Sequence, residues 1–193
     1  MSNDLMLDVG QANELKLAFR RADFSNDDIK RLCESNVLAD VRCVLLGRAV
    51  INVVEHVIDC DAQPFVPDGW SVEEHQKGGA FKWDKETQKE APYLSKGQAG
   101  SKYIEGNKLR KELTDKSTPV LNANVLDYLH ANPHLIPEKW KGKYVFFWGT
   151  VYRDRDGPLC VRCLFWSGGR WLWSYHRLSR DFDGGDPAAV RAS

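Results

Sequence analysis

The sequence predicts an α+β fold in which helices come first and an antiparallel sheet comes last. Two observations support this order. Apolar residues recur at helical spacing near the start, whereas the last quarter has runs of aromatic and β-branched residues broken by glycine and proline. The 193 residues can bury a sizeable core. We therefore divide the chain into an N-terminal helical segment, 1–48, and one domain, 49–193.

The N-terminal segment carries the signals of short helices. An amphipathic stretch at 15–19 ends before Asp23. Ser25 follows as a predicted N-cap, because the acids after it complement a helix dipole. The apolar spacing then continues to Gly47 with a break near Asn36, which indicates two helices. Apolar stripes of this kind usually pack into a core, so we expect a packing element without chemistry.

The stretch after the helical segment alternates between strands and loops. Val50 to Cys60 is rich in Val and Ile and predicts a strand. Asp61 to Trp70 contains two prolines and a glycine and predicts turns. Ala80 to Trp83 predicts a short strand. The polar stretch Asp84 to Gly100 has little periodicity, so we expect mobility there.

Two helices are predicted before the last quarter. The first spans Asn107 to Leu113. The second is capped by Asn122 or Asn124 and ends at Asn132, before a proline. Its predicted apolar face comprises Val125, Leu126 and Leu129.

The last quarter predicts an antiparallel meander. Tyr144 to Tyr152 is almost continuously aromatic and β-branched, which is typical of a central strand. Asp154 to Pro158 is a hairpin turn by composition. Leu159 to Trp166 is the return strand, Ser167 to Gly169 a second turn, and Arg170 to Tyr175 a third strand.

Alternation divides the third strand between two faces. Five of the seven tryptophans lie at or after Trp140, and aromatic residues at alternate positions most often belong to a core. We therefore assign these aromatics to the scaffold: Trp148, Trp166, Trp171, Trp173 and Tyr175. The residues predicted to face outward between them are Leu172, Ser174 and His176.

Composition excludes several classes of protein. The formal net charge is zero, so nothing indicates a nucleic-acid partner. No apolar run approaches the ~20 residues of a membrane helix, so we expect no membrane insertion. Asp4 and Asp8 stand where a secretory signal would be basic. The chain has five cysteines, an odd number. They fit free thiols, in a protein synthesised in a reducing cytoplasm, better than a disulfide framework.

Two cysteines near the C-terminus invite a catalytic interpretation. Cys160 and Cys163 form a Cys-x-x-Cys, which can serve redox chemistry or half of a zinc site. On a strand, a spacing of three sends the two thiols to opposite faces, and the chain has no second such pair. We therefore interpret them as unrelated thiols.

Other potential catalytic or metal-binding patterns are weaker. A metal pair would need His56 with Cys60, or His130 with His134, on one helical face, but the first pair lies in a predicted strand and a proline interrupts the second. The Gly-Gly pairs lack the context of a phosphate-binding loop. Ser174, His176 and Asp181 have no nucleophile elbow around them. We expect no catalytic residues, no metal and no cofactor.

The amino-acid types used in the last quarter suggest that many of its residues arose by mutation of one kind of codon. After Lys143 the chain contains no Lys, Glu, Gln, Asn, Met or Ile. An asparagine codon, AAC or AAT, changed at its two adenines yields residues such as Ser, Arg, His, Asp, Gly, Phe, Leu and Cys, and it cannot yield Lys, Glu, Gln, Met or Trp. The residues between the tail tryptophans belong to that first set.

The last quarter also resembles the corresponding part of a known family. The stretch from Tyr144 to Thr150 (YVFFWGT), with WSGGRWLW at 166–173 and PAAV at 187–190, resembles the C-terminal variable region of variable proteins of diversity-generating retroelements. In that family, a reverse transcriptase copies a template with adenine-directed errors into the gene of a binding protein. The resemblance implies a C-type lectin-like fold for 49–193, with a variable region at about 159–193.

The resemblance also implies a function and a set of binding residues. It implies a non-enzymatic protein that binds diverse ligands, most often protein surfaces, and that can be displayed on a virion or a cell surface. The residues implied to vary are Cys163, Phe165, Ser167, Leu172, Ser174, His176, Arg177, Ser179, Arg180, Phe182, Asp183, Gly185 and Asp186.

Two alternative functions remain open. A sugar-binding lectin suits the implied fold, although the calcium-dependent motifs Glu-Pro-Asn, Gln-Pro-Asp and Trp-Asn-Asp are absent. An oxidase related to formylglycine-generating enzymes, which share the lectin-like fold, would use Cys160 and Cys163. The sequence identifies neither the ligand nor the oligomeric state.

Overall fold

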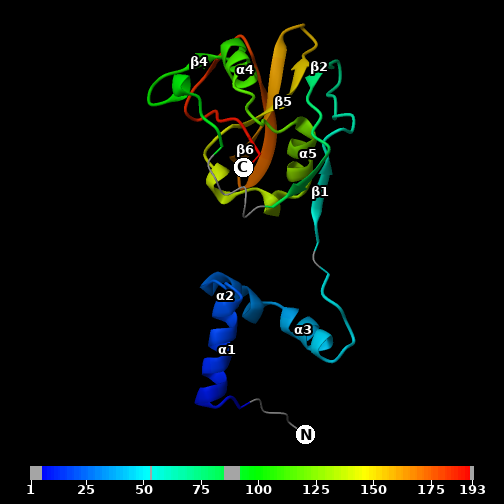
Figure 1. The fold of residues 1–193 in the computed structure, drawn as a ribbon, viewed down its shortest axis with the longest axis vertical. Coiled ribbons are helices and arrows are strands. Elements are labelled where there is room, and N and C mark those ends of the chain that lie inside the picture. Colours follow the sequence, from blue (N-terminus) through cyan, green and yellow to red (C-terminus); the bar gives the residue numbers. More distant parts are fainter. Residues whose placement is uncertain (1–5, 53, 85–91, 192–193) are drawn as a thin grey trace. The chain divides into compact units, whose positions relative to one another are not determined.

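The computed structural model describes residues 6–52, 54–84 and 92–191. The chain forms two compact units, Met1–Val54 and Glu55–Ser193. The first contains only helices and the second contains all of the described strands (Figure 1). This arrangement confirms the predicted α+β class with helices first and antiparallel strands last.

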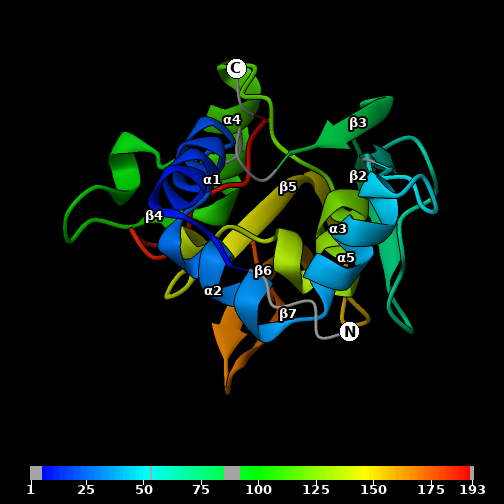
Figure 2. The same cartoon turned by 90° about the horizontal axis from the view of Figure 1, so that it is seen from below.

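The N-terminal unit consists of α1 (Val9–Arg21), α2 (Asn26–Glu34) and α3 (Val37–Leu45), joined by short turns (Figure 2). Ser25 caps α2 as predicted. Its hydroxyl accepts from the Asp28 amide, and the Asp28 carboxylate accepts from the Ser25 amide at 2.9 Å. None of the three helices contains a buried residue. The expectation that their apolar stripes pack into a core is therefore wrong within this unit. Capping boxes begin α1 and α2, whereas Asn36 makes no side-chain cap hydrogen bond at the start of α3.

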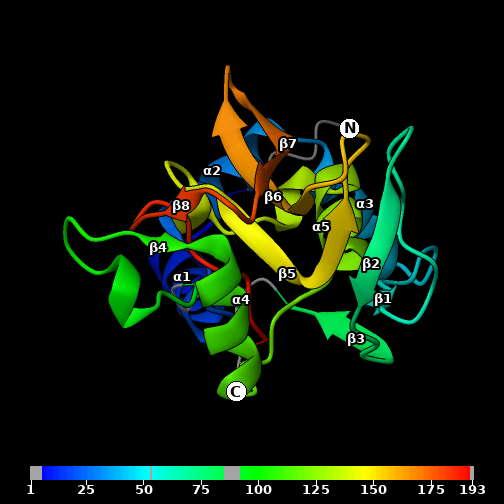
Figure 3. The same ribbon diagram turned by 90° about the horizontal axis from the view of Figure 1, so that it is seen from above.

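A four-stranded antiparallel sheet organises the C-terminal unit. Its order is β2 (Ser71–His75), β5 (Val145–Arg153), β6 (Leu159–Ser167) and β7 (Arg170–Arg177). Figure 3 shows β2 and β7 at opposite sides of the sheet. The predicted meander at 144–175 is confirmed, with the first predicted strand inside the sheet.

Smaller elements surround this sheet. Two-stranded pairs join β1 (His56–Asp59) to β3 (Ala80–Trp83) and β4 (Ile104–Glu105) to β8 (Asp181–Phe182). The helices are α4 (Gly106–Asp115) and α5 (Ala123–Ala131), and the short 3₁₀ turns are η2 (Lys96–Gln98), η3 (Pro133–Leu135) and η4 (Glu138–Trp140).

The predicted strands of the last quarter agree with these bounds, whereas α1 starts at Val9 rather than at Leu15, and β4 and β8 were not predicted. The middle of the chain differs more. The strand predicted at Val50–Cys60 is confined to His56–Asp59, and β2 was not predicted. β2 starts after a proline-rich loop and carries two glutamates, so its sequence lacks an apolar pattern. Of the stretch predicted to be mobile, 85–91 lie outside the described residues.

Helices and loops cover both faces of the sheet. On one face, Phe147 and Leu164 pack with Leu126 of α5, and on the other, Phe146 and Trp148 pack with residues of α4 such as Leu113. Every residue of β5 before its last is consequently buried, which explains its continuous apolar run.

One glycine lets α5 approach the sheet. A Cβ atom at Gly149 would lie 2.9 Å from Cβ of Asn122, the residue before α5. The Gly149 amide donates to the Leu121 carbonyl at 2.9 Å. A larger residue at this position would therefore separate the start of α5 from β5.

A buried ion pair joins α5 to β6. Arg162 is 1% exposed, and its guanidinium donates to both carboxylate oxygens of Asp127, at 3.1 and 2.7 Å. The same group lies 4.3 Å from the ring centre of Trp173 and 5.3 Å from that of Phe65. Aromatic rings and one carboxylate thus replace water around the cation.

We expect Asp127→Ala to lower the free energy of unfolding by about 3 kcal/mol, because it leaves a buried cation without its partner. We take the lower end of the usual range because the Asp127 side chain is 32% exposed. Urea denaturation measures the loss. The matched double variant, Asp127→Leu with Arg162→Met, should recover most of it. Equal losses in both variants would show that packing, rather than charge pairing, stabilises this region.

Candidate ligand-binding surface

A regular hairpin forms the centre of the predicted variable region. β6 and β7 pair without a register shift from Cys160 opposite Arg177 to Ser167 opposite Arg170. The turn consists of Gly168 and Gly169, with φ of 58° and 79°. Two consecutive positive φ values define a type I′ turn, whose twist matches that of antiparallel strands. The turn thereby sets which side chains share a face.

The predicted division of β7 between two faces agrees with this register. Trp171 and Trp173 lie opposite Trp166 and Leu164, on the face covered by α5. The residues that share the other face are Leu172, Ser174 and His176. The exposure of the aromatic face is less uniform than predicted. Tyr175 is 43% exposed, so its assignment to a buried scaffold is wrong.

The predicted variable residues differ in accessibility. Those exposed to solvent are Ser167, Ser179, Arg180 and Asp183. Those partly exposed are Phe165, Leu172, Ser174, His176, Arg177, Gly185 and Asp186. The remaining two, Cys163 and Phe182, are 1% and 0% exposed.

The predicted surface position of these last two residues is therefore wrong. Cys163 points into the core on the α4 side of the sheet, together with Val161. Phe182 packs its ring 4.9 Å from the ring centre of Phe146 and 5.1 Å from that of Trp148. Because a ligand cannot reach either side chain, both belong to the scaffold.

A shallow hollow of about 210 Å³ lies at the end of β7. It is lined by Tyr175, His176, Arg177 and Arg180, of which the last three are predicted variable residues. The His176 ring packs against the edge of Phe182, 4.8 Å between ring centres. The hollow therefore combines the rings of Tyr175 and His176 with the guanidinium groups of the two arginines.

The two arginines of the hollow have different surroundings. Arg177 donates from Nε to Asp154 at 2.7 Å and from Nη2 to Asp156 at 2.6 Å. Arg180 is exposed and has no ion-pair partner among the described residues. Arg180 is thus the cation available to an acidic group of a ligand.

Residues outside the predicted variable region hold the backbone of its last loop. Gln98 is buried, 1% exposed, and its side-chain amide donates to the main-chain carbonyls of Asp183 and Asp186, each at 2.9 Å. The Tyr144 amide donates to the carbonyl of Gly185 at 2.8 Å, and the Phe146 amide to that of Pro187 at 2.9 Å. These contacts involve main-chain atoms of the loop and none of its side chains.

The start of α4 holds the preceding segment in the same way. The Gly106 amide donates to the carbonyl of Arg180, and the Asn107 amide to that of Leu178, both at 2.9 Å. A Cβ atom at Gly106 would lie 2.6 Å from the Phe182 ring and 2.8 Å from the Leu178 backbone. Only glycine permits this approach. Sequence reasoning missed Gly106 and Gln98, because neither lies in a recognisable motif.

Two predicted variable residues serve their own loop instead. The Asp183 carboxylate accepts from the Gly185 amide at 2.7 Å, and the Asp186 carboxylate accepts from the Asp183 amide at 3.1 Å. Burial raises the pKa of Asp186 above its ordinary value, while the hydrogen bond from Asp183 opposes this shift. These contacts give both carboxylates a local structural role.

The two thiols of the Cys-x-x-Cys are separated by the sheet, as the strand spacing predicted. Cys163 belongs to the core on the α4 side, whereas Cys160 packs with Tyr152 and Ala123 on the other. Burial raises the pKa of each thiol to about 12. No group of three or more His, Cys, Asp or Glu within 6–52, 54–84 and 92–191 could hold a metal ion.

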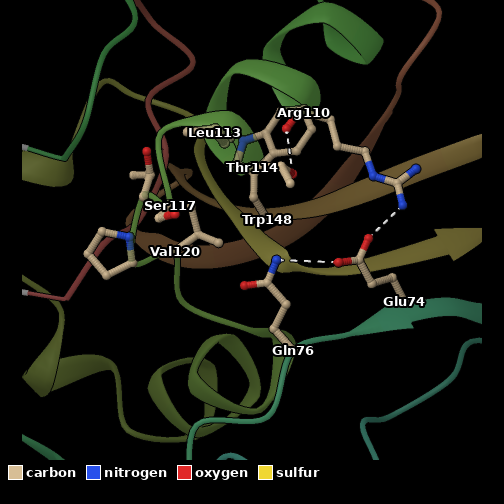
Figure 4. A pocket seen from close by; sticks show the side chains of 10 residues that line it. Glu74, Gln76, Arg110, Leu113, Thr114, Ser117, Val120 and Trp148 are labelled. Carbon is tan, nitrogen blue, oxygen red and sulfur yellow. Dashed lines mark hydrogen bonds and ion pairs between the residues drawn. The ribbon is translucent and has the colours of Figure 1, made fainter.

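A second cavity, of about 320 Å³, lies between α4 and β2 and was not predicted (Figure 4). Arg110 spans it and donates to Glu74 at 2.6 Å, while Thr114 and Ser117 supply hydroxyls to its lining. Trp148 lines it as well, although its buried indole N–H has no hydrogen-bond partner among the described residues. The cavity is polar and lies beside β2, away from β7.

Comparisons with known proteins add no family. No family model matches the chain, and neither a curated protein nor a solved structure matches it. Within the part of the chain that the structure describes, no helix is long and apolar enough to cross a membrane.

Native-state alkylation tests the buried position of the thiols. At pH 8, we expect iodoacetamide to modify the exposed Cys33 and to leave Cys160 and Cys163 unmodified until denaturant is added, because a buried thiol with a pKa of about 12 is neither accessible nor ionised. Peptide mass mapping measures the pattern, with Cys33 as the internal control. Rapid modification of Cys163 in the native protein would return it to the ligand-binding surface.

The raised pKa of Asp186 predicts a pH-dependent effect of Asp186→Asn. An acid with a raised folded-state pKa stabilises the fold while protonated and loses that contribution as pH rises through the folded-state pKa. The amide keeps an oxygen for the Asp183 amide. The stability of the Asn variant relative to the parent should therefore increase from pH 3 to pH 7, measured by urea denaturation. Ser179→Ala is the control, and a pH-independent difference would contradict the prediction.

Proposed function

We propose that this chain is a non-enzymatic, ligand-binding variable protein of a diversity-generating retroelement. In this proposal, adenine-directed mutagenesis changes residues at about 159–193, and the rest of a C-type lectin-like domain presents them. The ligand is most often the surface of another protein, and the protein can be displayed on a virion or a cell surface.

One observation carries the proposal. The segment from Leu178 to Pro187 is anchored through its main-chain carbonyls by donors at Gln98, Gly106, Asn107, Tyr144 and Phe146. These donors lie outside the predicted variable region. A binding loop whose side chains are to change needs backbone contacts that do not depend on them, and this anchoring supplies such contacts beside those made by the Asp183 and Asp186 carboxylates.

The grouping of the candidate residues also supports the proposal. His176, Arg177 and Arg180 line one hollow, and Leu172 and Ser174 share the sheet face of His176. Substitutions at exposed positions usually change stability by no more than ~0.5 kcal/mol. Exposed positions such as Arg180 therefore tolerate many sequences, whereas Arg177 also pairs with the buried carboxylate of Asp154.

The alternative functions receive less support from the geometry. An oxidase of the formylglycine-generating type would use its cysteines together, but Cys160 and Cys163 point to opposite faces of the sheet. A sugar-binding lectin remains compatible with the polar cavity beside Glu74 and Arg110, although no contact there favours a sugar over another polar ligand.

The gene and its flanking DNA test the proposal. We expect a near-copy of the segment encoding Leu159 to Ser193, with differences almost only where the copy has adenine, and a reverse-transcriptase gene nearby. The structure sharpens this expectation, because codons for exposed residues such as Arg180 should differ more often than those for Cys163 and Phe182. If no such repeat exists, the tail is an ordinary tryptophan-rich sheet.

A further inference from the structure

The outer edge of β7 carries unpaired backbone groups. β7 is the last strand of the sheet, and β6 is its only partner among the described residues. Figure 3 shows it on the side away from β2. Exposed edges of this kind are pairing sites for another extended chain.

The hairpin register identifies the groups that point outward. A two-residue type I′ turn makes Ser167 and Arg170 a hydrogen-bonded pair, and such pairs alternate along an antiparallel ladder. The N–H and C=O groups of Trp171, Trp173 and Tyr175 therefore point away from β6. They offer a partner alternating donors and acceptors.

The middle of the edge lacks the usual protection against pairing. Natural edge strands are blocked by charged side chains, especially lysine, by proline, by bulges or by a covering helix or loop. The charged residues of β7, Arg170 and Arg177, lie at its two ends. β7 contains neither proline nor lysine, and its pairing with β6 shows no register shift, whereas the β2–β5 and β5–β6 pairings both do. The regular outer edge is therefore suitable for strand addition.

The two faces beside this edge differ in character. On one face, Phe65 is 53% exposed with its ring against Trp173, and Tyr175 is 43% exposed with its ring 4.8 Å from that of Trp70. The other face carries three predicted variable residues: Leu172, Ser174 and His176. An added strand would place alternate side chains over an aromatic face and over a variable face.

We propose that the outer edge of β7 binds an extended segment of a partner protein by strand addition. This inference rests on the proposed function and specifies how the ligand is recognised. Main-chain hydrogen bonds to Trp171, Trp173 and Tyr175 supply affinity that does not depend on the side chains of the variable face. The residues on the variable face supply specificity.

Charge indicates the chemistry of the bound segment. Arg170 lies at the start of β7 and Arg180 follows its end, and both are exposed without an ion-pair partner in the described part of the chain. An extended segment with acidic residues at its ends complements them. Its middle residues are apolar at alternate positions, because they face Phe65 and Tyr175.

A second copy of the chain fits this edge less well. Antiparallel pairing of two β7 strands centred on Trp173 would set Leu172 of each copy against Ser174 of the other, and Arg170 against His176. Leu172 and Ser174, both predicted to vary, would then face each other in two symmetry-related contacts, so a change at either residue would alter both contacts. A segment from a different protein avoids this coupling.

N-methylation of a selected peptide tests the pairing. A displayed library of random peptides is panned against the full chain, and the most enriched peptide is the probe. N-methylation removes one amide donor at a time. Strand addition predicts a loss of affinity of about tenfold at alternate residues and little change between them, measured by calorimetry. Loss without alternation, or failure to enrich any peptide, would overturn the proposal.

Two variants of one residue test the same contact from the protein side. Tyr175→Pro and Tyr175→Ala both remove the ring, but only proline removes the outward N–H, and an edge strand tolerates proline there. We expect similar urea midpoints and an affinity for the probe about tenfold lower for the proline variant. Equal affinities would overturn strand addition, as would a dimer of the parent chain that Tyr175→Pro converts to monomer in sedimentation.

These outcomes are separable from failure of the proposed function. A gene that carries the adenine-linked repeat, together with a probe that binds without alternation, would leave the variable protein in place and remove the pairing mode. Alternating N-methyl effects without a repeat in the gene would retain the pairing mode and remove the retroelement.

Discussion

The C-terminal unit depends on one buried charge, the guanidinium of Arg162. A cation inside a sheet is costly unless its charge is paired. Asp127 supplies the charge from α5, and the rings of Trp173 and Phe65 supply polarisable surface. The pair thus fixes α5 over β6, and it also explains why Trp173 is a scaffold residue although part of its ring is exposed. The aromatic face of β7 takes its position from this contact.

The other face of the sheet is held by main-chain contacts and aromatic packing rather than by a buried ion pair. There, α4 approaches with its start toward the last strand, and Gly106 lets two amides reach carbonyls near Phe182. Phe182 fills the space that remains, with Trp148 beside it. The predicted variable tail is therefore bound to the scaffold by two buried rings and a set of main-chain contacts. Its exposed side chains contribute little to this attachment, apart from Asp183 and Asp186.

Much of the fold could be predicted from the sequence, because strong periodicity and turn residues mark the helices and the meander at 144–175. β2 could not, because a strand with two glutamates has no apolar alternation. The alternation of side chains along β7 assigned its two faces correctly. Burial depends on which other elements cover each face, and the sequence of one strand does not give that information. Cys163 and Phe182, which the resemblance implied to vary, were misplaced because a position carried over from a family does not say what covers the side chain in this chain. Arg162 left a signal, a charge inside an apolar run, that indicates a buried partner without naming it.

The direction of the hydrogen bonds around 178–187 determines which amino-acid substitutions keep the anchoring contacts. In each anchoring contact described, the tail supplies the carbonyl and the scaffold supplies the donor. Every amino acid has a main-chain carbonyl, proline included, whereas proline lacks the amide hydrogen. Pro187 itself accepts in this way from Phe146. These carbonyl contacts therefore remain whichever amino acid a tail codon specifies, whereas the contacts in which the tail donates, from Ala188 to Tyr93 and from Ala189 to Phe146, would be lost with proline at those positions.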